Sequence, residues 1–105
     1  MEKKPGRTRS GEDAAESPVI DRALIEKRFR MDLLFWISTE PRTALRILKL
    51  VEEVIRTPFH GQGKPEALRH DQRGVWARRI TEEHRLTYYF VSRQICFAAA
   101  RYHYR

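Results

Sequence analysis

The spacing of apolar residues changes midway along the chain, from a helical period to a period of two. In the first half, apolar side chains recur at intervals of three and four residues, which is the spacing of one face of a helix. The first such segment contains Phe29, Leu33, Trp36 and Ile37. This pattern predicts an amphipathic helix whose apolar face packs against another element.

A second amphipathic helix is predicted to follow directly. Pro41 suits the first turn of a helix, where the missing N–H would have no partner in any case. Thr57 and Pro58 end the helical pattern. Between these limits we expect one side of the helix to be apolar, formed by Leu45, Leu48, Val51 and Ile55. Two such helices in succession form a hairpin.

Beyond the second helix, the sequence is typical of a loop followed by strands. Gly61, Gly63 and Pro65 indicate the loop. Three strand-like runs follow, at residues 75–81, 84–91 and 95–102. A short apolar stretch at residues 19–25 is compatible with a first strand, although Asp21 and Arg22 interrupt it.

The middle strand of the three is predicted to have two different faces. Its apolar side chains are Leu86, Tyr88 and Phe90, and they alternate with Arg85, Thr87 and Tyr89. We expect the helices to cover the apolar face and the arginine-bearing face to stay open. The predicted fold class is therefore α+β, a two-helix hairpin packed on one face of a twisted, mainly antiparallel sheet of four to five strands.

The length of the chain, 105 residues, leaves room for one domain, which we place at residues 19–105. Residues 1–18 are rich in Lys, Arg, Glu, Gly and Ser without apolar periodicity, so we predict a disordered N-terminal extension. The net charge is +7, and because residues 1–21 contribute −1, the remainder carries +8. This charge points to a polyanionic partner, either nucleic acid, an acidic protein segment or both.

The composition favours a cytoplasmic location. No apolar run approaches the roughly 18 residues of a membrane span, and the N-terminal basic residues are not followed by the apolar stretch of a signal peptide. The single cysteine, Cys96, cannot form an internal disulfide and stands where a small hydrophobic residue is expected. We therefore expect a protein of the reducing cytoplasm with no membrane partner.

The C-terminal half contains residue types that together could cleave RNA without a metal ion. The ribose 2′-OH must lose its proton, the charge on a five-coordinate phosphate must be stabilised, and the departing 5′-oxygen must be protonated. A carboxylate can act as the base, arginines can stabilise the phosphate, and a histidine, with an ordinary pKa of about 6.5, can donate the proton. The candidates are Glu66, Arg69, Arg79, Arg85, His103 and Tyr104.

Three motifs, in the same order, resemble those of one known family. They are residues 56–70 (RTPFHGQGKPEALRH), residues 76–88 (WARRITEEHRLTY) and residues 101–104 (RYHY). They are similar to the YoeB/Txe branch of the RelE-type toxins, which are ribosome-dependent mRNA interferases of bacterial toxin–antitoxin modules. The similarity runs from about residue 33 to residue 104 and implies a RelE-like fold for the domain.

The resemblance implies a role for each candidate residue. Glu66 would be the general base, Arg85 would stabilise the phosphate and His103 would be the general acid. The residues implied in binding the phosphate or the substrate are Arg69, Arg79 and Tyr104. The expected products are a 2′,3′-cyclic phosphate and a free 5′-hydroxyl.

The sequence departs from the family pattern at three positions. Ala67 stands where proline is usual, Arg69 stands where lysine is frequent, and Arg105 extends beyond the usual terminal tyrosine. An arginine at position 69 keeps the charge of lysine but not its compact geometry.

Neighbouring residues have simpler structural interpretations. Arg78 and Arg79 are adjacent and should point to opposite faces of a strand, so at most one belongs to the site, and we assign Arg79. His84 should lie on the face opposite Arg85, beside the core. Glu82 and Glu83 should turn a hairpin.

The remaining histidines and tryptophans also favour structural roles. His60 and His70 lack Cys or carboxylate neighbours at ligand spacing, so we expect neither a metal nor another cofactor. Trp36 and Trp76 are interpreted as core aromatic residues, with contact to a partner as the alternative for Trp76.

The leading functional hypothesis is the toxin of a type II toxin–antitoxin system that enters the ribosomal A site, cleaves the mRNA there and inhibits translation. Its partners would be mRNA, the ribosome and a YefM-like antitoxin, and a homodimer is possible. The alternative is a catalytically inactive RelE-like binding module that acts with its antitoxin in a DNA-bound repressor complex. A general RNA-binding protein without cleavage is disfavoured, because no recognised RNA-binding motif is present.

Overall fold

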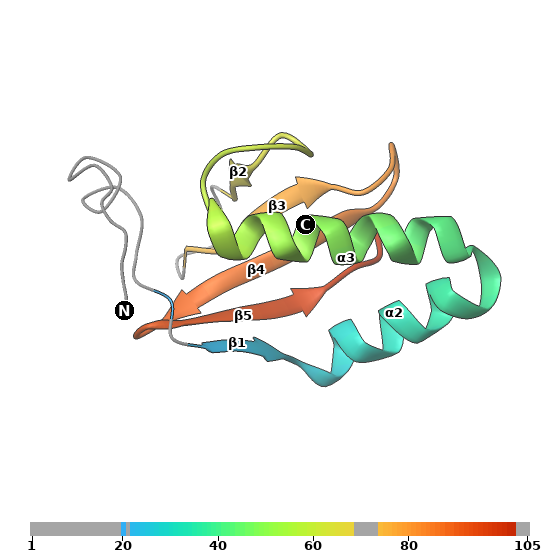
Figure 1. Cartoon of the computed structure of the whole chain (residues 1–105), viewed down its shortest axis with the longest axis horizontal. Coiled ribbons are helices and arrows are strands. Elements are labelled where there is room, and N and C mark those ends of the chain that lie inside the picture. Colours follow the sequence, from blue (N-terminus) through green and yellow to red (C-terminus); the bar gives the residue numbers. More distant parts are fainter. Residues whose placement is uncertain (1–19, 21, 69–73, 103–105) are drawn as a thin grey trace, which may run out of the picture.

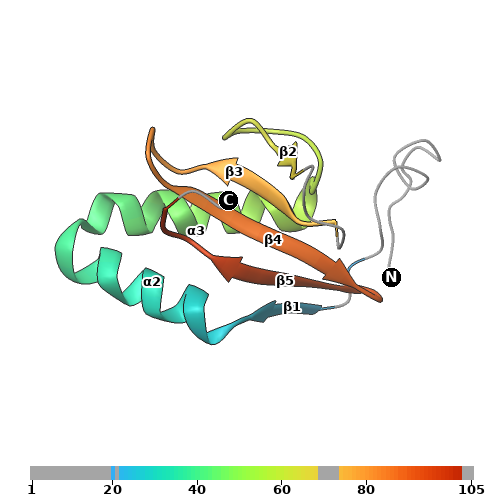
Figure 2. The same ribbon diagram turned by 180° about the vertical axis from the view of Figure 1, so that it is seen from behind.

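The computed structural model describes Ile20, residues 22–68 and residues 74–102. Both helices lie on one face of the sheet (Figure 1), and the view from behind shows the strands in front of them (Figure 2). The elements, in chain order, are β1 (Arg22–Ile25), α2 (Lys27–Thr39), α3 (Pro41–Arg56), β2 (Glu66–Ala67), β3 (Trp76–Arg79), β4 (Arg85–Val91) and β5 (Gln94–Ala99).

The sheet has five strands in the order β1-β5-β4-β3-β2. β1 runs parallel to β5, and the other three pairings are antiparallel. The predicted α+β architecture is confirmed. The strand expected within residues 19–25 is present as β1 at one edge of the sheet, with all of its residues exposed.

The two predicted helices are also confirmed, and a single residue, Glu40, separates them. Pro41 occupies the first turn of α3, as expected from its fixed φ and missing N–H. At the other end, the N–H of Thr57 bonds to Glu53 O and closes the helix one residue before Pro58. Neither helix is long and apolar enough to cross a membrane.

The apolar face predicted for α3 is wrong by one residue. The side chains that pack on the sheet are Ala44, Ile47, Leu50 and Val54, whereas Leu45 and Leu48 are about half exposed. Val51 and Ile55 lie at the margin of the core. In α2, Phe29 and Trp36 are buried as predicted, but Ile37 is exposed. Leucines follow both sides of α3, so the sequence pattern alone offers two apolar stripes.

The strands differ from the prediction in one respect that bears on the site. Glu66 was expected in a loop, but it begins β2, a two-residue strand that pairs with β3. The three longer strands fall within the predicted segments or extend one residue beyond them. Glu82 and Glu83 lie in the connection between β3 and β4, as expected for a hairpin.

The hydrophobic core lies between the helices and the sheet. Tyr88 and Phe97 are fully buried there, and their ring centroids are 6.1 Å apart. Burying a large apolar side chain contributes about 1.5–3 kcal/mol, so this layer supplies most of the stability of a domain of this size. The core residues are Phe29, Trp36, Ala44, Ile47, Leu50, Val54, Ile80, Leu86, Tyr88, Ile95, Phe97 and Ala100.

The face of β4 that was expected to be open is only partly so. Arg85 and Tyr89 are partly exposed, but Thr87 between them is buried. A register irregularity between Thr87 and Tyr88 interrupts the pairing of β4 with β5 at this point.

Candidate active site

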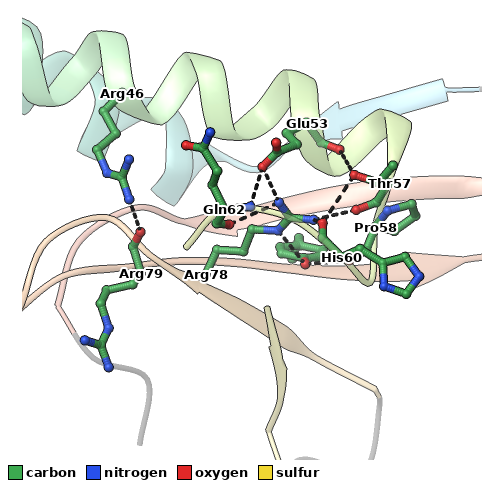
Figure 3. A network of polar contacts seen from close by, with 9 residues as sticks. Arg46, Glu53, Thr57, Pro58, His60, Gln62, Arg78 and Arg79 are labelled. Atoms are coloured by element: carbon green, nitrogen blue, oxygen red, sulfur yellow. Dashed lines mark hydrogen bonds and ion pairs between the residues drawn. The ribbon is translucent and has the colours of Figure 1, made fainter. Parts of the chain in front are cut away.

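Strand register places three of the predicted site residues on one face of the sheet. Arg79 and Arg85 are direct partners across the β3–β4 pair, so their side chains project to the same side. Glu66 is the partner of Ala77, which precedes Arg79 by two positions and therefore shares its face. The side chain of Arg79 points away from α3 (Figure 3). These three residues thus bring one carboxylate and two guanidinium groups to the face opposite the helices.

Arg85 is held by the turn that precedes it. Its Nη1 donates to the carbonyl oxygens of Thr81, Glu82 and His84 at 2.8, 3.1 and 3.1 Å. These three bonds involve Nη1 alone, whereas Nε and Nη2 lie on the other edge of the guanidinium plane. That edge is a suitable donor pair for a phosphate.

Arg79 is fixed through its backbone. Its N–H donates to Gly63 O at 2.6 Å, and its carbonyl oxygen accepts from Nη2 of Arg46 on α3 at 3.0 Å. The side chain of Arg79 is partly exposed, and hydrogen bonds at both its N–H and its carbonyl oxygen fix the backbone from which it projects. A fixed cation next to Arg85 could stabilise developing negative charge without reorganising.

The residues just before the C-terminus are anchored beside Arg85. The N–H of Arg85 donates to Tyr102 O at 3.1 Å, and the N–H of Tyr102 donates to Nδ1 of His84 at 2.7 Å. On the other side, Nη2 of Arg28 donates to Arg101 O at 3.1 Å, and the Arg101 guanidinium lies 3.5 Å from the ring centre of Phe35. Tyr102 is therefore tied to the first residue of β4.

Three predicted site residues, Arg69, His103 and Tyr104, lie outside the described residues. His103 directly follows Tyr102 in the chain. His84, expected beside the core, packs its ring on the edge of Trp36 with centroids 4.8 Å apart, in addition to accepting the Tyr102 bond.

Arg78, the neighbour that we did not assign to the site, points toward α3 and is completely buried. Its Nη1 lies 2.9 Å from Oε1 of Glu53 (Figure 3). The paired arginines thus have opposite environments, one inside the protein and one on the open face. The burial of Arg78 and the contribution of Glu53 and Arg46 were not predicted, because contacts between a helix and a strand leave no periodic signal in the sequence.

A groove of about 520 Å³ runs along α3, and none of the predicted site residues lines it. Its walls combine cationic, acidic and apolar side chains. They are Arg42, Leu45, Arg46, Lys49, Leu50, Glu52, Glu53, Arg56 and Gln62. Within the part of the chain that is described, no three His, Cys, Asp or Glu side chains gather closely enough to hold a metal ion.

Comparison with known families gives a match over most of the chain. Residues 25–104 match the profile of a family described as the YoeB-like toxin of bacterial type II toxin-antitoxin systems. The toxin YoeB of Escherichia coli K12 is 49% identical over 73 residues, which cover 70% of this chain and 87% of that protein.

Solved structures give a corresponding match of fold. The YoeB/ParE toxin from Agrobacterium tumefaciens superimposes with a TM-score of 0.74 at 36% identity, covering 79% of this chain and 99% of the other. A YoeB dimer from Staphylococcus aureus gives a TM-score of 0.72 at 28% identity, covering 79% of this chain and 97% of the other. The YoeB chain of a heterotetrameric YoeB-YefM toxin-antitoxin complex from the same organism gives 0.69 at 29% identity, with 78% and 95% covered.

Proposed function

The chain belongs to the YoeB-like toxins of bacterial type II toxin-antitoxin systems, and from this premise we propose that it is a ribosome-dependent endoribonuclease. It cleaves mRNA at the ribosomal A site and thereby inhibits translation. The observation that carries the proposal is the shared sheet face of Glu66, Arg79 and Arg85, which follows from the strand register. The proposed base and the proposed phosphate-binding cations thus face the same side.

The proposed chemistry divides among these residues. Glu66 takes the proton of the ribose 2′-OH, whose oxygen then attacks the adjacent phosphorus. Arg85 and Arg79 stabilise the negative charge that builds up on the phosphate oxygens. His103 gives a proton to the departing 5′-oxygen, and the products are a 2′,3′-cyclic phosphate and a 5′-hydroxyl. The reaction needs no metal ion or cofactor.

The anchored stretch before the C-terminus supports the role of His103. The N–H of Arg85, the proposed phosphate-binding arginine, donates to Tyr102 O, and His103 is the next residue in the sequence. We assign Tyr104 to placing the scissile nucleotide and Arg69 to binding the phosphate. Both assignments rest on the motifs of the family.

The ribosome and the mRNA are the proposed nucleic-acid partners. Residues 22–105 carry a net charge of +8, which favours docking on ribosomal RNA through phosphate contacts. The ribosome would then hold the mRNA in a reactive geometry that the small protein alone cannot impose. We place this activity in the cytoplasm, where translation occurs.

A YefM-like antitoxin is the proposed protein partner. The Staphylococcus aureus relative is found in a YoeB-YefM complex and also as a YoeB dimer. For this chain we propose a cognate antitoxin whose acidic or partly disordered segment covers the cationic face, and a homodimer in its absence.

Primer extension on ribosomes translating a defined mRNA tests the proposed activity. The wild-type protein, released from its antitoxin, is compared with Glu66→Ala and His103→Ala. We expect the wild type to cut within the A-site codon, and each variant to be at least about 100-fold slower, as the loss of an acid or base predicts. Glu52→Ala is the matched control for Glu66→Ala, because Glu52 is an exposed carboxylate that does not belong to the proposed site.

Two results would contradict the proposal. If no protein cuts RNA with or without ribosomes while the wild type still binds its antitoxin, the chain is the binding module of a repressor complex. If the wild type cuts and both site variants cut equally fast, the family activity is present but Glu66 and His103 are not its acid and base.

A further inference from the structure

Arg78 is a buried cation whose hydrogen-bonding capacity is fully used. A guanidinium group has five N–H donors, and Arg78 makes five bonds in the structure (Figure 3). Nε donates to the Tyr88 hydroxyl at 3.3 Å, and Nη1 donates to Glu53 Oε1 at 2.9 Å. The other three bonds go to main-chain carbonyls of the loop after α3.

These carbonyls come from one short segment, residues 57–62. Nη2 donates to Thr57 O at 2.5 Å and to His60 O at 2.6 Å, and Nη1 donates to Gln62 O at 3.2 Å. Two further bonds hold the same segment through the partners of Arg78. The Tyr88 hydroxyl donates to Pro58 O at 2.8 Å, and Glu53 Oε1 accepts the N–H of Gln62 at 2.8 Å.

Two glycines allow this loop to approach so closely. Gly61 has a φ of +114°, and a Cβ there would lie 2.8 Å from Glu53 Oε1. Gly63 has a φ of +82°, and a Cβ there would lie 3.0 Å from Arg79 O. A side chain at either position would strain the backbone. At Gly61 it would also collide with the Glu53 carboxylate, and at Gly63 it would press on the Arg79 carbonyl oxygen.

The loop leads directly into Glu66. Gly63 O accepts the N–H of Arg79 at 2.6 Å, and three residues later Glu66 pairs with Ala77. β2 contains only two residues, and the one bond among the described residues that continues the pairing beyond it runs from the Leu68 N–H to Val75 O at 2.9 Å, so this pairing alone holds Glu66 weakly. The position of the Glu66 carboxylate therefore depends on the loop that precedes it.

We propose that Arg78 is a positioning residue for Glu66: by holding the carbonyl groups of residues 57–62 against α3 and β4, it fixes the loop that places the Glu66 carboxylate on the same face as Arg79 and Arg85. The inference rests on the proposed function, in which Glu66 is the general base. The two adjacent arginines then have different roles. Arg79 binds the phosphate of the RNA on the open face, and Arg78 positions the loop that carries Glu66 from the opposite face of the sheet.

Arginine is required at this position because of its geometry as well as its charge. A lysine keeps the positive charge near Glu53, but it has three donors on one nitrogen and cannot reach five acceptors arranged around a planar fork. We therefore expect Arg78→Lys to fold and to leave part of the loop unanchored. A misplacement of about 1 Å can lower a catalytic rate about 100-fold.

A double-mutant cycle with Glu66 tests the inference. Cleavage of ribosome-bound mRNA is measured at increasing toxin concentration for the wild type, Arg78→Lys, Glu66→Ala and the double variant. We expect Arg78→Lys to lower the maximal rate by about 10-fold or more, with little change in the concentration giving half-maximal rate. In the Glu66→Ala background the same substitution should change the rate by less than about 3-fold, because no base is left to misplace.

Arg46→Lys is the matched control. Arg46 also binds backbone carbonyls from α3, but its partners are Ile80 and Arg79 at the end of β3, and none lies in residues 57–62. Arg46→Lys should change the cleavage rate by the same factor in the wild-type and the Glu66→Ala backgrounds. Amide hydrogen exchange should show faster exchange in residues 57–67 of Arg78→Lys and unchanged exchange in β4 and β5.

The outcomes separate the two proposals. If the wild type does not cleave RNA, or cleaves equally fast without Glu66, the proposed function fails and the inference fails with it. If cleavage depends on Glu66 but Arg78→Lys slows both backgrounds equally, only the inference is overturned, and Arg78 serves the fold alone. Should Arg78→Lys fail to fold, Tyr88→Phe replaces it in the same cycle, because it removes two bonds of the network and keeps the buried ring.

Discussion

The carboxylate of Asp32, on α2, accepts the backbone N–H of Ala100 at 2.9 Å, across 68 residues of sequence. The indole N–H of Trp36, one turn further along the helix, donates to the carbonyl oxygen of the same residue at 2.8 Å. Both polar groups of the fully buried Ala100 are thus satisfied by α2. The end of β5, from which Tyr102 and the C-terminal residues continue, is fixed to the helix.

Asp32→Ala should therefore destabilise the domain considerably. The substitution leaves the Ala100 N–H buried without a partner, which costs about 1–3 kcal/mol, and it also removes the ion pair with Arg28. Asp32→Asn keeps an acceptor for the N–H and should have a smaller effect. Urea denaturation of the three proteins measures the difference. Equal stability of Asp32→Ala and the wild type would mean that water replaces the carboxylate.

Thr87→Val, in contrast, should stabilise the domain. Oγ1 of Thr87 is buried and has no hydrogen-bond partner among the described residues. Replacing the hydroxyl by a methyl group of similar shape removes this unsatisfied group, so we expect a gain of about 1 kcal/mol in the free energy of unfolding.

Thr57→Val is the control for that gain. The single O–H of Thr57 has two carbonyl acceptors within reach, Glu53 O at 3.1 Å and His60 O at 3.2 Å, so the same substitution there should destabilise. Both variants are compared with the wild type by urea denaturation. A loss of stability in Thr87→Val as large as that in Thr57→Val would show that the Thr87 hydroxyl is bonded in solution.

The contact between Tyr89 and Glu26 should make stability depend on pH in the alkaline range. The hydrogen bond to the Glu26 carboxylate, with a smaller effect of burial, raises the pKa of Tyr89 to about 12. Because the folded-state pKa is raised, the contribution is fully present below the unfolded pKa of about 10 and is lost as the pH rises toward the folded value. Tyr89→Phe should therefore be less stable than the wild type at about pH 8, and this gap should close toward about pH 12.

Urea denaturation of the two proteins at several pH values measures the gap. The contact is near the surface, so the effect at neutral pH should not exceed about 1 kcal/mol. Tyr102→Phe, at another exposed tyrosine, is the matched control. A gap for Tyr89→Phe that stays constant with pH would contradict the assigned contact.

The fold could be predicted because the spacing of apolar residues distinguishes helices from strands. With two helices followed by several strands, packing both helices on one face of the sheet is one of few possible arrangements. The site could be predicted only in part. The sequence identifies Glu66, Arg79 and Arg85 as candidates, but their common face depends on the register of Arg79 with Arg85 and of Glu66 with Ala77. That register is set by an irregular turn and by a two-residue strand, neither of which has a periodic pattern.

The other features that the sequence did not predict are contacts between residues far apart in the chain. The bonds of Asp32 to Ala100 and of Arg78 to the loop join elements that are far apart in the chain. A buried charge resembles a surface charge in the sequence, because its burial depends on partners that only the fold brings together. The wrong face of α3 has a related cause, since the sheet, and not the helix sequence, decides which of two apolar stripes is buried.

Adjacent residues on α3 provide a direct test of the buried stripe. Ile47 is fully buried in the core, whereas its neighbour Leu48 is 46% exposed. Ile47→Ala should lower the free energy of unfolding by about 2–5 kcal/mol, because it removes buried methyl groups and leaves a cavity. Leu48→Ala should change it by no more than about 0.5 kcal/mol, because alanine is a better helix former and little buried surface is lost. Urea denaturation of the toxin alone measures both values. If Leu48→Ala is the more damaging of the two, the stripe expected from the helical pattern is the one that packs on the sheet, and the register of α3 on β4 and β5 is wrong.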